Sequence, residues 1–370
     1  MAEAGPATAS SCSDWDAFVS WDNLLHSWKA AAAGKRGGAA AARWEYRLGD
    51  QLLRLQQALQ SGQWQPGRYL RFEVHEPKRR TISAAPFGER VVHHALMRVT
   101  AARFERLFSP KSYANRLGMG TLGAIEAVSS YCRSHPWALR LDVKQHFPSI
   151  DHALLLAELR RRIADDRLMA VVEKIVASGA TPLQNAADAV HLPGDDLLTA
   201  DRLRGLPIGN LTSQWWSNVY MDTMDAFITR TLGCGAYARY VDDMVLFCDN
   251  KRTLNEWEHA VRDQALTRLR LRLHVRSAQA QQTAAGIPWL GMVIYPDHRK
   301  LKSRKVVAAT RSLTRAWQAW QREEIEFADF DARVQGWIAN AAQADSWRIR
   351  AHVLQRFDLR RQRSRECQLA

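Results

Sequence analysis

The chain has 370 residues, of which 46% are hydrophobic, so it is long enough to bury a sizeable core and to form two or three subdomains. Its net charge of +14 and pI near 9.9 favour a polyanionic partner, although a merely basic, well-solvated surface has the same composition. The five cysteines are scattered without a C-x-x-C pair, and no apolar run reaches about 18 residues, so composition excludes a disulfide framework and a transmembrane helix. We therefore expect a cytoplasmic protein without a secretion signal or membrane association.

Apolar periodicity and turn residues predict an α+β chain. Residues 1–14 are small and polar and are expected to be disordered. Helical periodicity predicts helices at residues 15–28, 44–59, 88–108, 120–135, 211–232 and 254–274, with one or two more between 151 and 205. Strands are predicted at residues 71–74 and 81–83, before Asp142, on both sides of Asp242, and within 286–295. The tail from residue 302 is predicted to be helical and is rich in Trp and Arg.

Two adjacent carboxylates, Asp242 and Asp243, stand between apolar runs that alternate and are rich in β-branched and aromatic residues. This pattern predicts two strands that meet at a tight turn, with the carboxylates at its tip. Like charges repel, and partly burying them costs on the order of several kcal/mol unless a cation joins them. A divalent metal that binds a nucleotide triphosphate explains the pair; a solvated Asp-Asp turn is the alternative.

A second carboxylate, Asp142, ends an apolar strand upstream, and Phe147 follows five residues later. Carboxylates from two neighbouring strands can hold two Mg²⁺ ions about 3.5–4 Å apart. Such a pair of ions activates an attacking oxygen and stabilises a phosphate leaving group. A helix cap or an exposed strand end is the alternative interpretation of Asp142.

Three segments in this order resemble successive palm motifs of reverse transcriptases: Asp142 with Phe147, residues 205–214, and the Tyr-Val-Asp-Asp sequence at 240–243. Most reverse transcriptases have Gln before the glycine and Pro after the serine of the second of these segments. Here Ile208 and Gln214 occupy those places, which is similar to bacterial reverse transcriptases of diversity-generating retroelements. The resemblance spans about residues 21–315 and includes the segments 82–87, 90–96 and 112–116.

This resemblance implies a right-hand polymerase fold, with fingers and palm at residues 15–300 and a small helical thumb with a basic tail at 301–365. It implies RNA-directed DNA polymerisation with two Mg²⁺ ions, for which Mn²⁺ is able to substitute. The implied partners are template RNA, an RNA/DNA hybrid, deoxynucleotide triphosphates and a small basic helical accessory protein. Two other functions stay open, namely an antiviral defence reverse transcriptase and a catalytically quiet nucleic-acid-binding relative.

The resemblance also implies roles for the palm residues. Asp142 and Asp242 ligate both metals, the Val143 carbonyl is a further ligand, and Asp243 tunes the site or ligates transiently. Phe147 lies under the incoming sugar as a steric gate against a 2′-hydroxyl; a core aromatic is the alternative.

The nucleotide and the primer have further expected contacts. Arg79 and Arg80 grip the triphosphate from a fingers hairpin, since the guanidinium fork binds phosphate bidentately. Ile208 and Gly209 form the floor of the templating pair, because glycine lets the backbone approach closely. The primer grip is assigned to Trp289, Leu290 and Gly291, for which a plain hairpin core is the alternative.

The last third of the sequence carries two further expectations. No lysine stands near residue 276, where related enzymes carry one that protonates pyrophosphate, so we assign no proton donor. The basic cluster at residues 299–305 is expected to contact duplex phosphates. The tail tryptophans are expected to form the thumb core rather than stacking platforms; they are Trp317, Trp320, Trp337 and Trp347.

Overall fold

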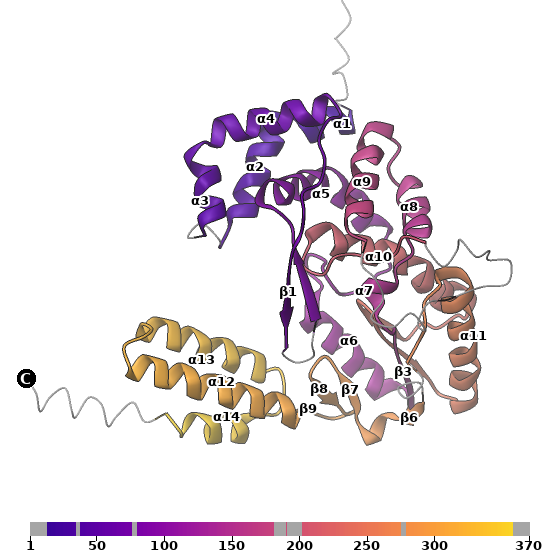
Figure 1. Ribbon diagram of the computed structural model, residues 1–370. Helices are drawn as coiled ribbons and strands as arrows, with labels where there is room; N and C mark the ends of the chain where they lie inside the picture. The colour runs from indigo at the N-terminus through magenta and orange to yellow at the C-terminus, as the bar shows by residue number, and fades with distance from the viewer. Residues whose placement is uncertain are drawn as a thin grey trace, which may run out of the picture.

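The computed structural model describes residues 13–34, 38–75, 80–180, 190, 202–274 and 279–357. Helices and antiparallel strands form three regions, which we call fingers, palm and thumb; Figure 1 shows the fingers at the top and the thumb at the lower left. The predicted α+β class is confirmed. The predicted disorder of residues 1–14 falls largely outside the described residues, but Ser13 caps the first helix and Asp14 begins it. Within the described ranges, no helix is long and apolar enough to cross a membrane.

The fingers combine short helices with one hairpin. Ser20 is extended, and its side chain accepts a hydrogen bond from the Asn23 amide, so the single helix predicted at residues 15–28 is wrong and is split in two. The helix predicted at 44–59 is likewise divided at Arg47. The predicted strand pair is confirmed, with Leu70 opposite Ala84. The elements are α1 (Asp14–Val19), α2 (Trp21–Ala32), α3 (Ala39–Tyr46), α4 (Leu48–Gln60), β1 (Leu70–Val74), β2 (Arg80–Ala84) and α5 (Phe87–Leu107).

The palm contains the central sheet and most of its covering helices. The helix predicted at 254–274 ends early, because Arg270 takes a left-handed conformation with φ 50°. Residues 271–274 then run extended beside residues 142–144, joined by two backbone hydrogen bonds. The palm elements are α6 (Gly120–Ser134), β3 (Trp137–Asp142), α7 (His146–Ser149), α8 (His152–Arg160), α9 (Asp166–Ser178), α10 (Leu211–Ala226), the π-helix η3 (Phe227–Thr231), β4 (Tyr237–Tyr240), β5 (Asp243–Cys248), α11 (Lys251–Leu269) and β6 (Ala280–Gln282).

The palm sheet has the strand order β4-β5-β3-β6, and every neighbouring pair is antiparallel. Alternate residues of a strand point to opposite faces, and both faces of this sheet are buried. Leu139 and Leu141 of β3 join the large core shared with the fingers, whereas Ala138 joins a second core under α6. Burial on both faces explains why β3 and β5 are mostly apolar. Their antiparallel pairing sets Asp142 at the end of β3 beside Asp243 at the start of β5.

A small second sheet connects the palm to the thumb. It consists of β7 (Ile287–Trp289), β8 (Met292–Ile294) and β9 (Arg299–Leu301), and the thumb helices are α12 (Ser303–Gln321), α13 (Phe327–Ala341) and α14 (Trp347–Leu354). The rings of Trp317 and Trp320 pack on Phe330 at centroid distances of 5.4 and 6.1 Å, which confirms them as thumb core. Trp337 is half-buried. The core assignment of Trp347 is wrong, because the residue is 75% exposed and the guanidinium of Arg350 lies over its ring.

Candidate active site

The carboxylate turn lies where β4 meets β5 at the edge of the palm sheet. Tyr240 pairs with Asp243, and the two residues between them close the turn. Val241 has a φ of 59°, a left-handed conformation that is a genuine outlier for a β-branched residue. Asp142 is the register partner of Asp243, and register partners in antiparallel strands share one face. The fold therefore brings the three predicted carboxylates to a single edge.

Asp242 lies in an environment that opposes its charge. Burial raises its pKa to about 6, and the negative charges of Asp142 and Asp243 add to this effect. The positive charge of Arg80 acts in the opposite direction. A carboxylate whose pKa is raised by burial and by neighbouring negative charges is suited to receive a cation, because a metal offsets both the burial and the repulsion.

Asp243 differs from the other two carboxylates because a cation of the protein already pairs with it. Arg140, two residues before Asp142 on β3, donates a hydrogen bond of 2.7 Å to Asp243 Oδ1. The sequence prediction missed Arg140, although its position two residues from Asp142 placed it on the same face of the strand.

Among the described residues, no three His, Cys, Asp or Glu side chains gather closely enough to hold a metal ion by themselves.

The Val143 carbonyl is directed toward this edge. Val143 forms an antiparallel bridge with Leu273, flanked by hydrogen bonds from Lys144 N to Arg272 O and from His274 N to Asp142 O. In this pattern the N–H and C=O of the bridging residue point away from the partner segment. The carbonyl of Val143 therefore points to the side of β3 on which β5 lies, as a metal ligand requires.

Phe147 lies in the short helix α7, which follows the Asp142 strand through a left-handed Gln145 with φ 49°. Its ring is half-buried, packs against the large core and meets His146 edge-on at 5.3 Å. The backbone of Phe147 accepts a hydrogen bond from Leu206 N at 2.9 Å, so α7 is tied to the loop that carries Ile208. The steric-gate role stays a prediction, and partial burial leaves part of the ring accessible.

The loop with Ile208 and Gly209 is clasped by the fingers hairpin. Ser83 N donates a hydrogen bond of 2.9 Å to the Ile208 carbonyl. Gly209 has a φ of 117°, and a Cβ there would stand 3.2 Å from Ile82 Cγ2, so only glycine fits without strain. The neighbour in this contact is the fingers hairpin, and the approach of a nucleotide to Gly209 stays a prediction.

A polar network that the sequence did not suggest anchors the same loop to α5. Tyr69 accepts from Asn210 Nδ2 at 3.0 Å and donates to Glu89 Oε1 at 2.8 Å. His93 lies 3.3 Å from that same carboxylate and 3.1 Å from the Thr212 hydroxyl. Burial raises the pKa of the Tyr69 hydroxyl, and the charge of Glu89 adds to the effect. The network fixes the loop against the fingers.

The two predicted triphosphate ligands have different outcomes. Arg80 begins β2 and is exposed, and its positive charge acts on Asp242 to lower the pKa of that carboxyl. Arg79 lies outside the described residues. The hairpin thus brings at least one guanidinium toward the site.

The candidate primer grip is a two-residue hairpin turn. Leu290 has a φ of 42° and Gly291 a φ of 90°, as tight hairpins between twisted strands require. Trp289 is fully buried in the second palm core, so its side chain belongs to the hairpin core. Lys302 N donates to the Gly291 carbonyl at 3.1 Å, which attaches the turn to the base of α12.

The basic cluster at 299–305 divides between structure and surface. Arg299 donates to Ser129 Oγ at 2.8 Å and to the Gln343 carbonyl at 3.4 Å, so its guanidinium joins the palm to the thumb. On α12, Arg304, Arg311 and Arg315 are exposed, and none of them forms a salt bridge within the part of the chain that the structure describes. Spacings of seven and four residues place these three on one helix face, opposite the buried Leu313.

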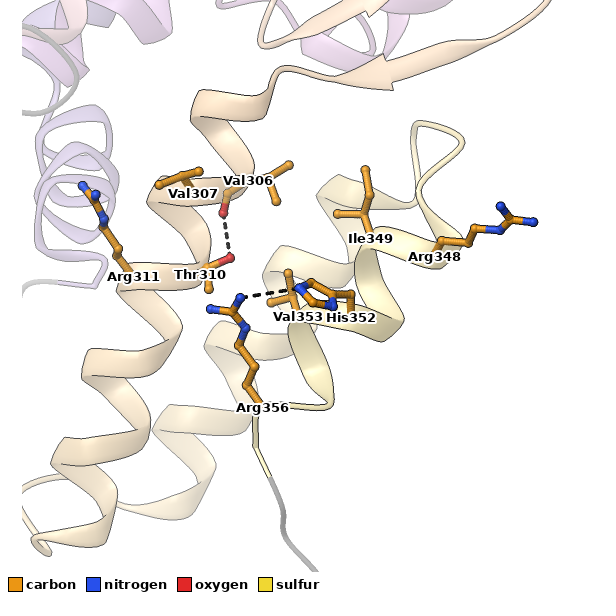
Figure 2. Close-up of a pocket in the computed structure, with 9 residues that line it drawn as sticks. All are labelled: Val306, Val307, Thr310, Arg311, Arg348, Ile349, His352, Val353 and Arg356. Carbon is orange, nitrogen blue, oxygen red and sulfur yellow. Dashed lines mark hydrogen bonds between the residues drawn. The ribbon is translucent and has the colours of Figure 1, made fainter.

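A groove of about 500 Å³ lies between α12 and α14. Figure 2 shows its apolar floor, which includes Val306 on α12 and Val353 on α14, with arginines at its margins. On the α14 side of the groove, Arg356 Nη2 lies 3.5 Å from His352 Nε2. The thumb surface described here is therefore basic on the exposed face of α12 and along this groove; the lining residues are Val306, Val307, Thr310, Arg311, Arg348, Ile349, His352, Val353 and Arg356.

The three regions and the carboxylate turn define a polymerase of the right-hand class. Residues 75–294 match the family model described as "Reverse transcriptase (RNA-dependent DNA polymerase)", a range that covers more than half of the chain. The chain therefore belongs to the reverse transcriptase family, and the predicted resemblance is confirmed at that level.

Individual relatives are distant. The chain is 23% identical to Protein YkfC of Escherichia coli over 300 residues, which are 70% of this chain and 73% of that protein. It is 25% identical over 167 residues to the "Uncharacterized 91 kDa protein in cob intron" of Schizosaccharomyces pombe, covering 44% of this chain and 19% of that protein. A structure of apo telomerase from Candida tropicalis has a TM-score of 0.49 at 11% identity, covering 65% of this chain and 49% of that chain.

Proposed function

We propose that this chain is an RNA-directed DNA polymerase that works with two divalent metal ions, Mg²⁺ or Mn²⁺. The observation that carries the proposal is the meeting of Asp142 and Asp242 at one edge of the palm sheet, where burial and mutual repulsion raise the pKa of Asp242. Such a pair is unfavourable without a cation, and the positive charge of Arg80 already acts on Asp242 in the opposite direction to its burial. This arrangement suits a metal-bound triphosphate.

The donor set fits divalent ions, which prefer carboxylate and carbonyl oxygens. Asp142, Asp242 and the Val143 carbonyl would hold them, while Asp243 is anchored by Arg140 and completes the negative edge. The bound ions supply Lewis acidity for the attacking 3′-oxygen and for the pyrophosphate leaving group. Around them, Phe147 restricts the sugar, Ile208 and Gly209 support the base pair, and Arg80 with Arg79 binds the phosphates.

Template RNA and the RNA/DNA hybrid are the proposed macromolecular partners. The net charge of +14 and the arginine stripe of α12 support this, because each neutralised phosphate releases bound counterions. The stripe consists of Arg304, Arg311 and Arg315, whose side chains stand on the face of α12 away from the thumb core. The accessory protein implied by the resemblance belongs to the same proposal, and co-purification from the native host tests it.

Primer extension tests the activity. Purified protein is given an RNA template, a DNA primer, Mg²⁺ and the four deoxynucleotides, and RNA affinity is measured in parallel. We expect extension by the wild type and its loss in Asp242→Ala with RNA affinity retained. The matched control is Asp249→Asn, an exposed carboxylate just beyond the far end of β5, which should extend normally. A wild type that binds RNA without extending any primer would favour the catalytically quiet relative.

Within the enzyme class, we propose error-prone copying in a diversity-generating retroelement. The support is the sequence around Gly209, where Ile208 and Gln214 replace the Gln and Pro of most reverse transcriptases. The flanking DNA should then contain a template repeat and a variable repeat that differ at adenines. Absence of both repeats, together with accurate copying, would favour the defence enzyme instead.

A further inference from the structure

A fully buried arginine stands directly behind the carboxylate turn. Arg239 of β4 is 0% exposed, and its guanidinium donates to both carboxylate oxygens of Asp225, at 2.7 and 2.6 Å. Its Nη1 donates to Asn218 Oδ1 and to the Val241 carbonyl, each at 3.0 Å. A buried charge is tolerated only when it is paired and hydrogen-bonded, and every nitrogen of this guanidinium has a partner.

The partners of Arg239 come from a rigid frame on α10. Asp225 and Asn218 both lie on this helix, and Asp225 also accepts a hydrogen bond of 2.8 Å from the hydroxyl of Tyr237. Asn218 Nδ2 in turn donates to the Ala114 carbonyl at 2.8 Å. Buried networks in which each member is satisfied hold a single arrangement, because any rearrangement leaves a polar group unpaired.

The backbone of Arg239 is fixed from the opposite side. Its N–H donates to the Lys111 carbonyl at 2.9 Å, and its carbonyl accepts from Tyr113 N at 3.0 Å. Arg116 donates to the Ser112 carbonyl at 2.8 Å and secures that segment. Residues 112–116, a segment of the reverse transcriptase resemblance without an assigned role, thus form a brace along β4.

The bond from Arg239 to the Val241 carbonyl connects this frame to the site. This carbonyl and the Asp242 N–H belong to one planar peptide group, so the orientation of the carbonyl fixes the position of the Asp242 backbone. Val241 holds a left-handed conformation that a β-branched residue rarely adopts, and such strain persists only where the surroundings impose it.

We propose that Arg239 is a positioning residue that holds the strained Val241 peptide and thereby places Asp242 for metal binding. This inference rests on the proposed two-metal function. Metal ligands must be held within about 0.5 Å of the productive geometry, and Asp242 has no regular strand partner of its own to hold it there. The frame of Asp225, Asn218 and the 112–116 brace supplies that support.

The test compares two changes that touch the same carboxylate. Arg239→Lys keeps a positive charge beside Asp225, but a compact ammonium cannot span Asp225, Asn218 and the Val241 carbonyl together. Tyr237→Phe removes one buried hydrogen bond to Asp225 and leaves the bond to Val241 intact. For each variant we would measure the melting temperature with and without Mg²⁺, the RNA affinity, and the Mg²⁺ concentration that gives half-maximal extension.

We expect Arg239→Lys to need at least threefold more Mg²⁺, to extend at least tenfold more slowly, and to lose most of the Mg²⁺-induced rise in melting temperature. Tyr237→Phe should melt earlier but keep the wild-type Mg²⁺ requirement. Introducing Val241→Gly should shrink the defect of Arg239→Lys, because glycine takes a positive φ without strain. An unchanged Mg²⁺ requirement in folded Arg239→Lys, or an equal defect in both backgrounds, would overturn the inference.

A second variant covers the case in which Arg239→Lys does not fold. The double change Arg239→Gln with Asp225→Asn leaves no unpaired buried charge, and neutral replacements of buried ion pairs are often tolerated. It should show the same raised Mg²⁺ requirement, and a wild-type requirement would again overturn the inference. A wild type that shows the Mg²⁺-induced rise but no extension contradicts the proposed polymerase alone; the variants are then judged by that rise.

Discussion

Replacing Asp242 with asparagine should make the metal-free protein more stable while it abolishes polymerisation. The reason is that Asp242 is held in its ionised form against burial and against the charges of Asp142 and Asp243. Asparagine has a similar shape and no charge, so it removes this unfavourable term. It also removes a metal ligand, so extension is lost.

The magnitude follows from the pKa of Asp242, which is raised from 3.8 to about 6. A raised pKa means that the folded state binds the proton of Asp242 more tightly than the unfolded state does. The contribution of Asp242 to the free energy of unfolding is therefore greatest below pH 3.8 and falls as the pH rises through 6. Above pH 6 the ionised carboxylate lowers the free energy of unfolding by up to about 3 kcal/mol. Solvent screening of the half-buried side chain reduces this amount. At about pH 5 roughly half of that cost is present.

Urea denaturation of wild type and Asp242→Asn, without metal, at pH 8 and pH 5 is the assay. We expect the variant to be more stable at pH 8 by about 1–3 kcal/mol, and the advantage to fall by about half at pH 5. Mg²⁺ should stabilise the wild type much more than the variant.

Two controls separate this effect from a general loss of charge. Asp249→Asn removes an exposed carboxylate and should change little. Asp243→Asn removes the charge-assisted bond to Arg140 and should destabilise the protein. The reasoning is refuted if Asp242→Asn is no more stable than wild type at pH 8, or if its advantage is the same at both pH values.

Four further predictions concern the nucleotide site and the basic surface. Phe147→Ala should let ribonucleotides extend the primer, because ring bulk excludes the 2′-hydroxyl; unchanged sugar discrimination in an active variant would make Phe147 a core residue. Ile208→Gln should lower the error rate, most clearly opposite template adenine, since about 1.4 kcal/mol of discrimination corresponds to about tenfold in selectivity. Sequencing of complementary DNA made by both proteins measures the error rate. Equal error spectra would show that Ile208 does not determine fidelity. Gly209→Ala should lower the free energy of unfolding, measured by denaturation, by about 1–3 kcal/mol, because a Cβ at φ 117° meets Ile82. An unchanged free energy would show that the fingers hairpin shifts to accept the added methyl group. Hybrid affinity should fall with salt at a log–log slope on the order of −5 if about six phosphates are neutralised, and a slope near zero would assign the charge to solubility.

Several features were determined by the sequence alone, because they depend on local pattern. The apolar runs that end in Asp142 and surround Asp242 predicted strands and a turn, and the structure places them side by side as register neighbours. The glycine at 209 marked a position where the backbone needs a positive φ, and the structure gives it a φ of 117°. Patterns of this kind depend on the residues within one strand or turn, so they can be recognised without knowing which segments pack against it.

Helix boundaries were less well determined, because a single side chain or dihedral angle decides them. Ser20 ends one helix and caps the next inside a segment whose apolar residues suggested a single helix. Arg270 turns left-handed and ends α11, so the following residues can lie beside Asp142. Exposure was also misjudged for Trp347, since helical spacing does not reveal whether another element covers a face.

Only the tertiary structure decided which polar groups meet. Arg140 pairs with Asp243 across two strands, and Tyr69 joins Asn210 to Glu89 although the three lie far apart in the chain. Arg239 reads in the sequence as an ordinary strand residue, yet the fold buries it completely between α10 and the carboxylate turn. The physical reason is that a charge can be buried only where distant segments supply all of its partners, and periodicity within one segment carries no information about the others.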